Sequence, residues 1–349
     1  MIRHPIVDED LAAILAAPVD WSRLDGASVL VTGAAGFLPA YMVETILARN
    51  ERCSGPPTRV LGLVRSLNRA RLRFAAYTRR SDLELIEHDV ATQLHKIGKV
   101  DFVVHAASQA SPKFYRTDPV GTISANTLGT EHMLRLALHA RVTGFLFFSS
   151  GDVYGPFPAH TPTSERDYGP VDCLDVRSCY SESKRMGENL CVAFHHQHGV
   201  PATIVRPFHT YGPGMRLDDG RVFADFVADV VHRRPIVLKS DGAATRAFCY
   251  LSDAAAGFFK VLLEGQAGQA YNIGNDLAEC SIAELAELLV QLFPERGLAV
   301  IRRERSADDP YIPSRLERSC PDISLARRLG WNPLVGPADG FLRTVRSFE

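Results

Sequence analysis

Three side chains of this sequence could together move a proton off an alcohol while a hydride leaves the carbon that bears it. Ser150 follows a short apolar run, and Tyr180 and Lys184 stand four positions apart in a predicted helix. Because positions four apart lie on one face of a helix, the phenol and the ammonium point the same way. Asp152, two residues after the serine, is a candidate for a further proton transfer, although Asp is also common in turns. These residues predict oxidoreductase-type chemistry.

The elements that must position these residues alternate between short apolar runs and amphipathic stretches. Alternating strands and helices indicate a parallel sheet with helices on both faces, so we predict an α/β fold with a Rossmann-type, doubly wound sheet. The expected strands are 28–32, 59–64, 83–87, 101–105, 144–148 and 201–206, and the main expected helices are 38–49, 126–140 and 180–196.

The predicted domain organisation has three parts. Residues 1–26 form an extension with one short helix, and residues 27–206 form the dinucleotide-binding Rossmann domain that carries the Ser, Tyr and Lys. Residues 207–349 form a smaller, mainly substrate-binding domain, with a segment near 245–275 that returns to the Rossmann sheet.

Composition limits the partners and the compartment. The 349 residues are 46% hydrophobic with a net charge of −1, so neither nucleic acid nor a membrane surface is an expected partner. No apolar run approaches 18 residues, and the seven cysteines form no CxxC pair, which favours a cytoplasmic protein with free thiols. The cluster 195–198 lacks a Cys or carboxylate at ligand spacing, so no metal site is predicted.

A glycine-rich loop directly follows the first predicted strand and opens a helix. Glycines at such a place let backbone N–H groups approach a pyrophosphate at the positive end of the helix. Pro39 stands where the usual pattern has a third glycine, but the first helical turn tolerates it. The predicted cofactor contacts here are Gly33, Ala35, Gly36, Phe37 and Leu38.

Further cofactor contacts are expected at the ends of the following strands. Arg65 stands where an acidic residue normally receives the adenosine ribose, so it leaves NADP open beside NAD. Asp89 could accept from the adenine amino group. The remaining expected contacts are Val90, the small residues Ala106, Ala107 and Ser108, then Pro207, and also Tyr180 and Lys184.

Several blocks in the same order make the chain resemble a known family. The blocks include 107–112, 177–180, 219–222 and 245–248, and, near the C-terminus, 308–310 and 321–323. Their sequences are similar to those of the extended short-chain dehydrogenases/reductases of the NAD-dependent epimerase/dehydratase family, and within it to the UDP-glucuronate decarboxylases.

The resemblance implies roles for the residues already singled out. Tyr180 would take the proton of the sugar O4, with its pKa lowered by Lys184 and by the oxidised nicotinamide, while Ser150 would hydrogen-bond the same O4. Lys184 would also hold the nicotinamide ribose of a tightly bound NAD that is recycled in every turnover. The substrate contacts that the resemblance implies are Ser111, Tyr115, Ser149, Ser150, His209, Arg221, Arg246 and Arg318.

The chain departs from this family at three places. Gly151-Asp152 replaces the Asp-Glu pair of the 4,6-dehydratases and the Ser-Glu pair of the decarboxylases. His209 replaces a usual Asn, which brings a charge that varies near neutral pH. Arg318 lies one residue further from Pro321 than the corresponding family arginine.

These departures leave alternatives to a UDP-glucuronate decarboxylase-like enzyme acting on a nucleotide sugar. The glycine and aspartate motivate a 4-epimerase or 4,6-dehydratase, and Arg65 motivates an NADPH-dependent ketosugar reductase. A dinucleotide-binding sensor or scaffold is disfavoured, because it has no need of Ser150, Tyr180 and Lys184. The family also implies a homodimer, formed through the helices at 126–140 and 180–196.

Overall fold

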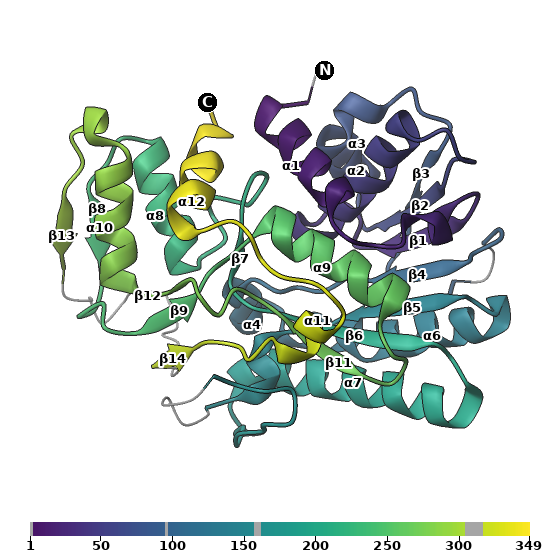
Figure 1. Ribbon diagram of the computed structural model, residues 1–349. Coiled ribbons are helices and arrows are strands. Elements are labelled where there is room, and N and C mark those ends of the chain that lie inside the picture. Colours follow the sequence, from purple (N-terminus) through teal and green to yellow (C-terminus); the bar gives the residue numbers. More distant parts are fainter. Residues whose placement is uncertain (1–2, 95–96, 157–161, 304–316) are drawn as a thin grey trace.

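The computed structural model describes residues 3–94, 97–156, 162–303 and 317–349, and its core is one parallel sheet (Figure 1). The strand order is β11-β6-β5-β4-β1-β2-β3, and every neighbouring pair is parallel. This arrangement confirms the predicted Rossmann-type α/β fold. The strands are β1 (Ser28–Thr32), β2 (Arg59–Val64), β3 (Leu83–Glu87), β4 (Phe102–His105), β5 (Gly144–Phe148), β6 (Ala202–Pro207) and β11 (Ala270–Ile273).

Helices cover both faces of the sheet because its central strands are apolar on both sides. Val29 and Val31 of β1 belong to the core under α2 and α9, whereas Leu30 belongs to the core under α6 and α7. The helices are α1 (Pro5–Ala16), α2 (Phe37–Arg52), α3 (Leu67–Arg73), α4 (Pro112–Thr117), α5 (Pro119–Asn126), α6 (Leu128–Ala140), α7 (Cys179–His198), α8 (Val222–Val231), α9 (Leu251–Glu264), α10 (Ile282–Leu292), α11 (Ser324–Arg328) and α12 (Pro337–Arg346).

The chain order of the sheet reverses at β1, which lies between β4 and β2. In open α/β sheets ligands bind in the crevice at such a reversal, beyond the carboxyl ends of the strands. The glycine loop follows β1, and the small residues at 106–108 follow β4, so both predicted cofactor segments meet at this crevice.

A second lobe lies on the left of Figure 1 and has its own core, built largely from α8, α10 and α12. The ring of Tyr211 stacks on Phe341 at 3.9 Å near the centre of this core. Short strands complete this part of the chain: β7 (Thr210–Tyr211), β8 (Ile236–Leu238), β9 (Thr245–Ala247), β10 (Cys249–Tyr250), β12 (Glu279–Ser281), β13 (Val300–Arg302) and β14 (Arg318–Ser319).

One predicted helix is divided in the structure. The stretch expected as 126–140 is α6, which begins at Leu128, and Asn126 ends the preceding α5. The sequence pattern missed α5, which starts with Pro119 and whose first turn is capped by Asp118, with Gly121 N–H donating to that carboxylate at 3.0 Å. The block 308–310 lies outside the described residues. Within the described ranges, the helices are all too short or too polar to cross a membrane.

Candidate active site

The glycine loop is shaped by close backbone contact with the end of β4. Gly33 has a φ of +64°, and a Cβ there would lie 2.9 Å from the Cα of Ala107, so only glycine fits. Gly36 caps α2 without a side chain, and the first backbone N–H groups of that helix have no side-chain acceptor. The loop therefore offers donors to an anionic group such as a pyrophosphate.

Below this loop lies a buried hydrogen-bond network that sequence reasoning missed. Thr32 Oγ1 accepts from the N–H groups of Ala106 (3.1 Å) and Ala107 (3.0 Å), and it lies 2.8 Å from His105 Nδ1. His105 Nε2 lies 3.1 Å from Thr130 Oγ1. Burial lowers the pKa of His105 to about 3, so the ring is neutral and its two nitrogens can accept and donate in turn. The available signal was a Thr and a His at the ends of adjacent parallel strands.

The residues around this loop suit an NAD-type cofactor. Ser108 Oγ is buried beyond β4 and has no hydrogen-bond partner among the described residues, so it is available to a bound group. Ala35, Phe37, Leu38 and Pro207 are half-buried at the same edge of the sheet, and Val90 is buried. Asp89 is exposed, with one carboxylate oxygen accepting from Ala91 N–H at 2.9 Å, and Arg65 is also exposed.

The structure brings the predicted hydroxyl and phenol together. Ser150 ends the loop after β5, and Tyr180 lies in the first turn of α7. The Ser150 hydroxyl is near enough to the Tyr180 phenol to lower its pKa against the larger rise caused by burial. The ring of Tyr115 stacks on that of Tyr180 at 5.0 Å and 18°. Both tyrosines are buried, at 3% and 6% exposure, so the phenol is held in one place.

Lys184 lies one turn further along α7, as its spacing predicted. Its ammonium donates to the carbonyl oxygen of Phe148 at 2.6 Å and lies 5.8 Å from the ring centre of Tyr180. Burial lowers the pKa of Lys184 to about 7. The expected lowering of the Tyr180 pKa by Lys184 is not found, because burial and the Asp152 charge raise that pKa above its usual value, and Ser150 and Arg221 only partly oppose the shift.

A buried ion pair supports both Lys184 and the serine loop. Arg206 of β6 donates from Nε and Nη2 to the two carboxylate oxygens of Glu188, at 2.8 and 2.5 Å. Ser149 Oγ donates to the same carboxylate at 2.5 Å. Ser149 was predicted as a substrate contact, but it is 5% exposed and its hydroxyl hydrogen is used in this network. Sequence reasoning missed Glu188 and Arg206, although the glutamate follows Lys184 by one helical turn.

Asp152 lies in the short 3₁₀ helix Gly151–Tyr154, and its side chain is exposed. Desolvation by the surrounding protein raises the pKa of its carboxyl. The positive charges of Arg177, Arg221 and Arg246 oppose that shift. Three guanidinium groups near one carboxylate suit the binding of an anionic substrate. Arg177 was part of the family block but was not among the predicted site residues.

A neighbouring aromatic ring leaves little room for a side chain at Gly151. A Cβ at this position would lie 3.2 Å from Phe208 Cε1 and Cζ, closer than ordinary van der Waals contact. The ring of Phe208 therefore takes part of the space that a family side chain would occupy beside Asp152.

Asp219 links two of the predicted substrate residues by hydrogen bonds. Ser111 Oγ, at the start of α4, donates to the carbonyl oxygen of Asp219 at 2.6 Å. Arg221, just before α8, donates to the carboxylate of the same residue at 2.5 and 3.0 Å. The predicted substrate residues Ser111 and Arg221 are thus linked, which fixes the guanidinium next to Tyr115 and Tyr180.

The sequence predicts that the charge of His209 varies near neutral pH, and in the structure it does not. Burial and the positive charges of Arg246 and Arg221 lower its pKa well below the usual value, so the ring is neutral. Its backbone has a φ of +29°, and its carbonyl oxygen accepts from Cys249 N–H at 3.3 Å. The structure thus places His209, Arg221 and Arg246 near one another.

Arg318 lies beside the site but in an ion pair. It stands on β14 opposite Thr245, next to Arg246 of β9. Its Nε and Nη2 each lie 2.7 Å from a carboxylate oxygen of Glu279, and this guanidinium lowers the pKa of Glu279 to about 2. A contact between Arg318 and substrate would therefore compete with an existing bidentate pair.

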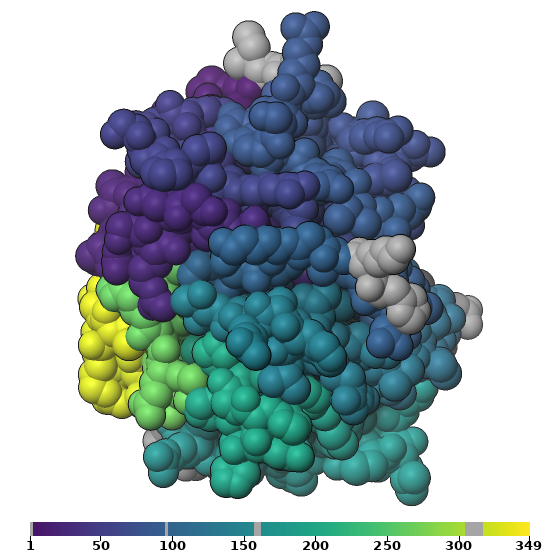
Figure 2. All heavy atoms as spheres, turned by 90° about the vertical axis from the view of Figure 1, so that its right-hand side faces the viewer, coloured from purple at the N-terminus to yellow at the C-terminus, as the bar shows by residue number. Residues whose placement is uncertain are grey.

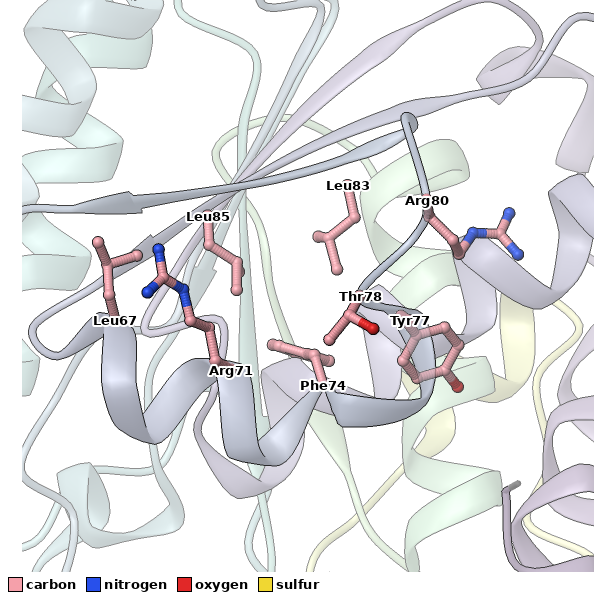
Figure 3. A pocket seen from close by; sticks show the side chains of 8 residues that line it. All are labelled: Leu67, Arg71, Phe74, Tyr77, Thr78, Arg80, Leu83 and Leu85. Carbon is pink, nitrogen blue, oxygen red and sulfur yellow. The ribbon is translucent and has the colours of Figure 1, made fainter. Parts of the chain in front are cut away.

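A hollow of about 430 Å³ lies away from these groups, between α3 and β3 (Figure 3). It is lined by Phe74, Tyr77, Thr78, Leu67, Arg71, Arg80, Leu83 and Leu85, and none of the predicted catalytic residues lines it. Within the described parts of the chain, no group of three or more His, Cys, Asp or Glu side chains could hold a metal ion.

Sequence comparisons relate the chain to a known family. The sequence profile of the NAD dependent epimerase/dehydratase family matches residues 29–274. UDP-glucuronic acid decarboxylase 6 of Arabidopsis thaliana is 37% identical over 316 residues, covering 89% of this chain and 86% of that protein. UDP-glucuronic acid decarboxylase 1 of Xenopus tropicalis is 33% identical, covering 94% and 73%.

Solved structures show the same fold. UDP-glucuronic acid 4-epimerase from Bacillus cereus, in complex with UDP-glucuronic acid and NAD, superposes with a TM-score of 0.77 at 23% identity, covering 92% of this chain and 98% of that one. This likeness supports the architecture of the sheet and the second lobe.

Proposed function

The chain is an enzyme of the NAD-dependent epimerase/dehydratase family, and from that membership we propose that it decarboxylates UDP-glucuronate. The observation that carries the proposal is that Ser150, Tyr180 and Asp152 lie near one another, at the edge of the sheet where the glycine loop opens. The identity to decarboxylases over most of the chain supports the choice of reaction.

In this proposal Tyr180 acts as a phenolate, which the positive charges of Lys184 and of a bound oxidised nicotinamide would favour against its raised pKa. The phenolate removes the proton of the sugar O4 while Ser150 holds that oxygen. NAD, when bound, supplies the hydride acceptor and later the donor, and it returns to its starting form. Oxidation at C4 makes the hexuronate a β-keto acid, whose C6 carboxylate leaves as carbon dioxide. The electron pair of the broken C5–C6 bond becomes an enolate at C4 and C5, which takes a proton at C5 before C4 is reduced again.

The arginines are assigned to the anionic parts of the substrate. Arg246 and Arg221 bind the diphosphate, because bidentate guanidinium groups match phosphate oxygens. Neutral His209 donates a hydrogen bond without adding charge. Asp152, with a raised pKa, is the candidate acid near C5. Tyr115 and Ser111 line the sugar end.

Gly151 and Asp152 favour a second candidate, a 4-epimerase or 4,6-dehydratase of another nucleotide sugar. The ring of Phe208 leaves little room for a side chain at position 151, so the space beside Asp152 differs from that in a family member that has one there. An NADPH-dependent ketosugar reductase would instead consume its cofactor in stoichiometric amounts; the exposed Arg65 is its only support.

We further propose a cytoplasmic homodimer with tightly held NAD. Leu128 of α6 and Met186 and Val192 of α7, the two helices predicted for the interface, are exposed at 49%, 51% and 43%, and the two helices pack against each other. Exposed apolar side chains on two adjacent helices suit a second copy of the chain. The described cysteines are all free thiols, as suits a reducing compartment.

The test is mass spectrometry of UDP-glucuronate after incubation with the purified protein and no added cofactor. Loss of carbon dioxide to give a UDP-pentose is expected, and Tyr180→Phe should retain NAD but form no product. An unchanged mass together with a new chromatographic peak would support the epimerase instead. Recovery of unaltered UDP-glucuronate from protein that contains NAD would reject this substrate.

A further inference from the structure

The amino-terminal helix α1 lies outside the segment that matches the family profile, yet it is built into the fold. It packs against α2 and α9, and Leu11 and Ile14 are buried in the main core. Figure 1 shows α1 between α12 and α2. Figure 2 shows the purple amino-terminal residues against the green and yellow carboxy-terminal segments.

The polar centre of this contact is Asp10, which is 2% exposed. Its Oδ2 accepts hydrogen bonds from the hydroxyls of Tyr41 (3.1 Å) and Tyr250 (2.8 Å). Its Oδ1 accepts from Arg343 Nη2 at 2.8 Å. One carboxylate thus joins three segments that are far apart in the sequence.

Each of the three partners belongs to a different working part of the molecule. Tyr41 lies on α2, the helix that begins at the glycine loop. Tyr250 lies on β10, four residues after Arg246, and β10 pairs with β7, which directly follows His209. Arg343 lies on α12, whose apolar face packs in the core of the second lobe.

Further contacts attach the amino-terminal extension to α9, which covers the Rossmann sheet. Lys260 of α9 donates to the carbonyl oxygen of Pro18 at 2.7 Å, and the ring of Trp21 lies 4.9 Å from that of Phe259. At the crevice itself, Phe37 of α2 contacts both the main core and the core of the second lobe. The extension and the ring of Phe37 therefore both lie at the junction between the two lobes.

A buried ion pair adds little net stability, because desolvation offsets much of the attraction. Its stronger effect is geometric, since a buried carboxylate that loses its donors is costly and each donor is held at one distance and angle. The Asp10 site has donors from both lobes, so its bonds are satisfied together in only one relative placement of the lobes.

We infer that the amino-terminal helix is a clamp between the cofactor and substrate lobes. Asp10 is then a positioning residue that fixes β10, and with it the nearby His209 and Arg246, relative to the helix that begins at the cofactor loop. Asp10 touches neither ligand. It acts through Tyr250 and Arg343 on the substrate side and through Tyr41 on the cofactor side.

Asp10→Asn tests this inference, with Glu9→Gln as the matched control. The amide cannot accept from all three donors, whereas Glu9, which also pairs with Arg343 (2.9 Å), has a side chain that is 64% exposed. We expect Asp10→Asn to weaken UDP binding and raise KM for the nucleotide sugar about tenfold, the equivalent of one to two lost hydrogen bonds. NAD affinity and kcat should change less than about threefold, and Glu9→Gln should match the unaltered protein.

Hydrogen exchange gives a readout that needs no turnover, so the inference can be tested even if the proposed substrate is wrong. In Asp10→Asn, amides of α12 and β10 should exchange faster while those of β4 and β5 stay protected. Tyr250→Phe, which removes one hydroxyl, should reproduce the effect more weakly if Asp10→Asn does not fold. A lower melting temperature with unchanged UDP affinity and unchanged exchange in α12 would overturn the inference and leave Asp10 a purely structural residue.

Discussion

The proposed cofactor end of the active site and the proposed sugar end are built in different ways. At the cofactor end, backbone contacts and short buried side chains set the shape, as at Gly33 and Thr32. At the sugar end, long charged side chains from separate strands and loops meet around Asp152. Backbone geometry leaves little freedom for alternative ligands, whereas arginines and their ion pairs can be rearranged with few changes. The difference explains why the cofactor class follows from the family and the sugar does not.

Tyr180→Phe should have the largest effect, because it should abolish the chemistry and leave the binding of both ligands intact. Removing the phenolic oxygen takes away the proposed proton acceptor, and general-base groups contribute about 10²–10⁴-fold, so kcat should fall by about a thousandfold. NAD content and UDP affinity should be retained, since neither is assigned to this oxygen. Turnover within about tenfold of the unaltered protein would contradict the assignment.

Both ends depend on the buried pair of Arg206 and Glu188 between them. Arg206→Met leaves a buried carboxylate without its main donor, so the free energy of unfolding should fall by about 3 kcal/mol. The control is Arg135→Met, which breaks the exposed pair with Glu131 and should cost less than about 0.5 kcal/mol. Equal chemical-denaturation curves for the two variants would show that the pair supports neither end.

The rigidity of the cofactor end can be tested at Gly33. Gly33→Ala places a side chain at positive φ and displaces Ala107, so NAD affinity should fall by about tenfold or more. Gly199→Ala is the matched control, because Gly199 has a φ of +70° with nothing within 4 Å of its Cβ position. The positive φ should cost each variant about 1 kcal/mol of stability, and Gly33→Ala should lose more because its Cβ would meet the backbone of Ala107. Retention of normal NAD affinity in Gly33→Ala would contradict the close approach of the loop.

The smallest expected effect concerns Glu279 and Arg318 at the sugar end. Because the pKa of Glu279 is lowered to about 2, its pair contributes stability that is present above the unfolded pKa of about 4.5 and is lost as the pH falls through about 2. Glu279→Gln should therefore remove this pH dependence. Between about pH 5 and 2, its free energy of unfolding should fall less than that of the unaltered protein, by a difference below about 1 kcal/mol. Glu84→Gln, in the half-exposed pair with Arg59, is the control. Identical acid profiles for Glu279→Gln and the unaltered protein would show that the pair adds nothing.

The contrast between the two ends also decides what the sequence could predict. The parallel strands, the glycine loop and the shared face of Tyr180 and Lys184 depend on local pattern, and the structure has them as expected. The neutral His209, the pairing of Arg318 with Glu279 and the burial of Ser149 depend on residues far away in the chain, which no local spacing reveals. The role of Asp10 is of this second kind, since its partners lie 31, 240 and 333 positions away.

The most direct test of the central claim, a transient oxidation at C4 that reverses within one turnover, uses UDP-glucuronate carrying deuterium at C4. The protein is incubated with this substrate and unlabelled NADH in solution, and the nucleotide-sugar product is analysed by mass spectrometry. The account predicts a UDP-pentose that has lost carbon dioxide and kept the deuterium. A decarboxylated product without deuterium, or no decarboxylated product at all, would contradict it.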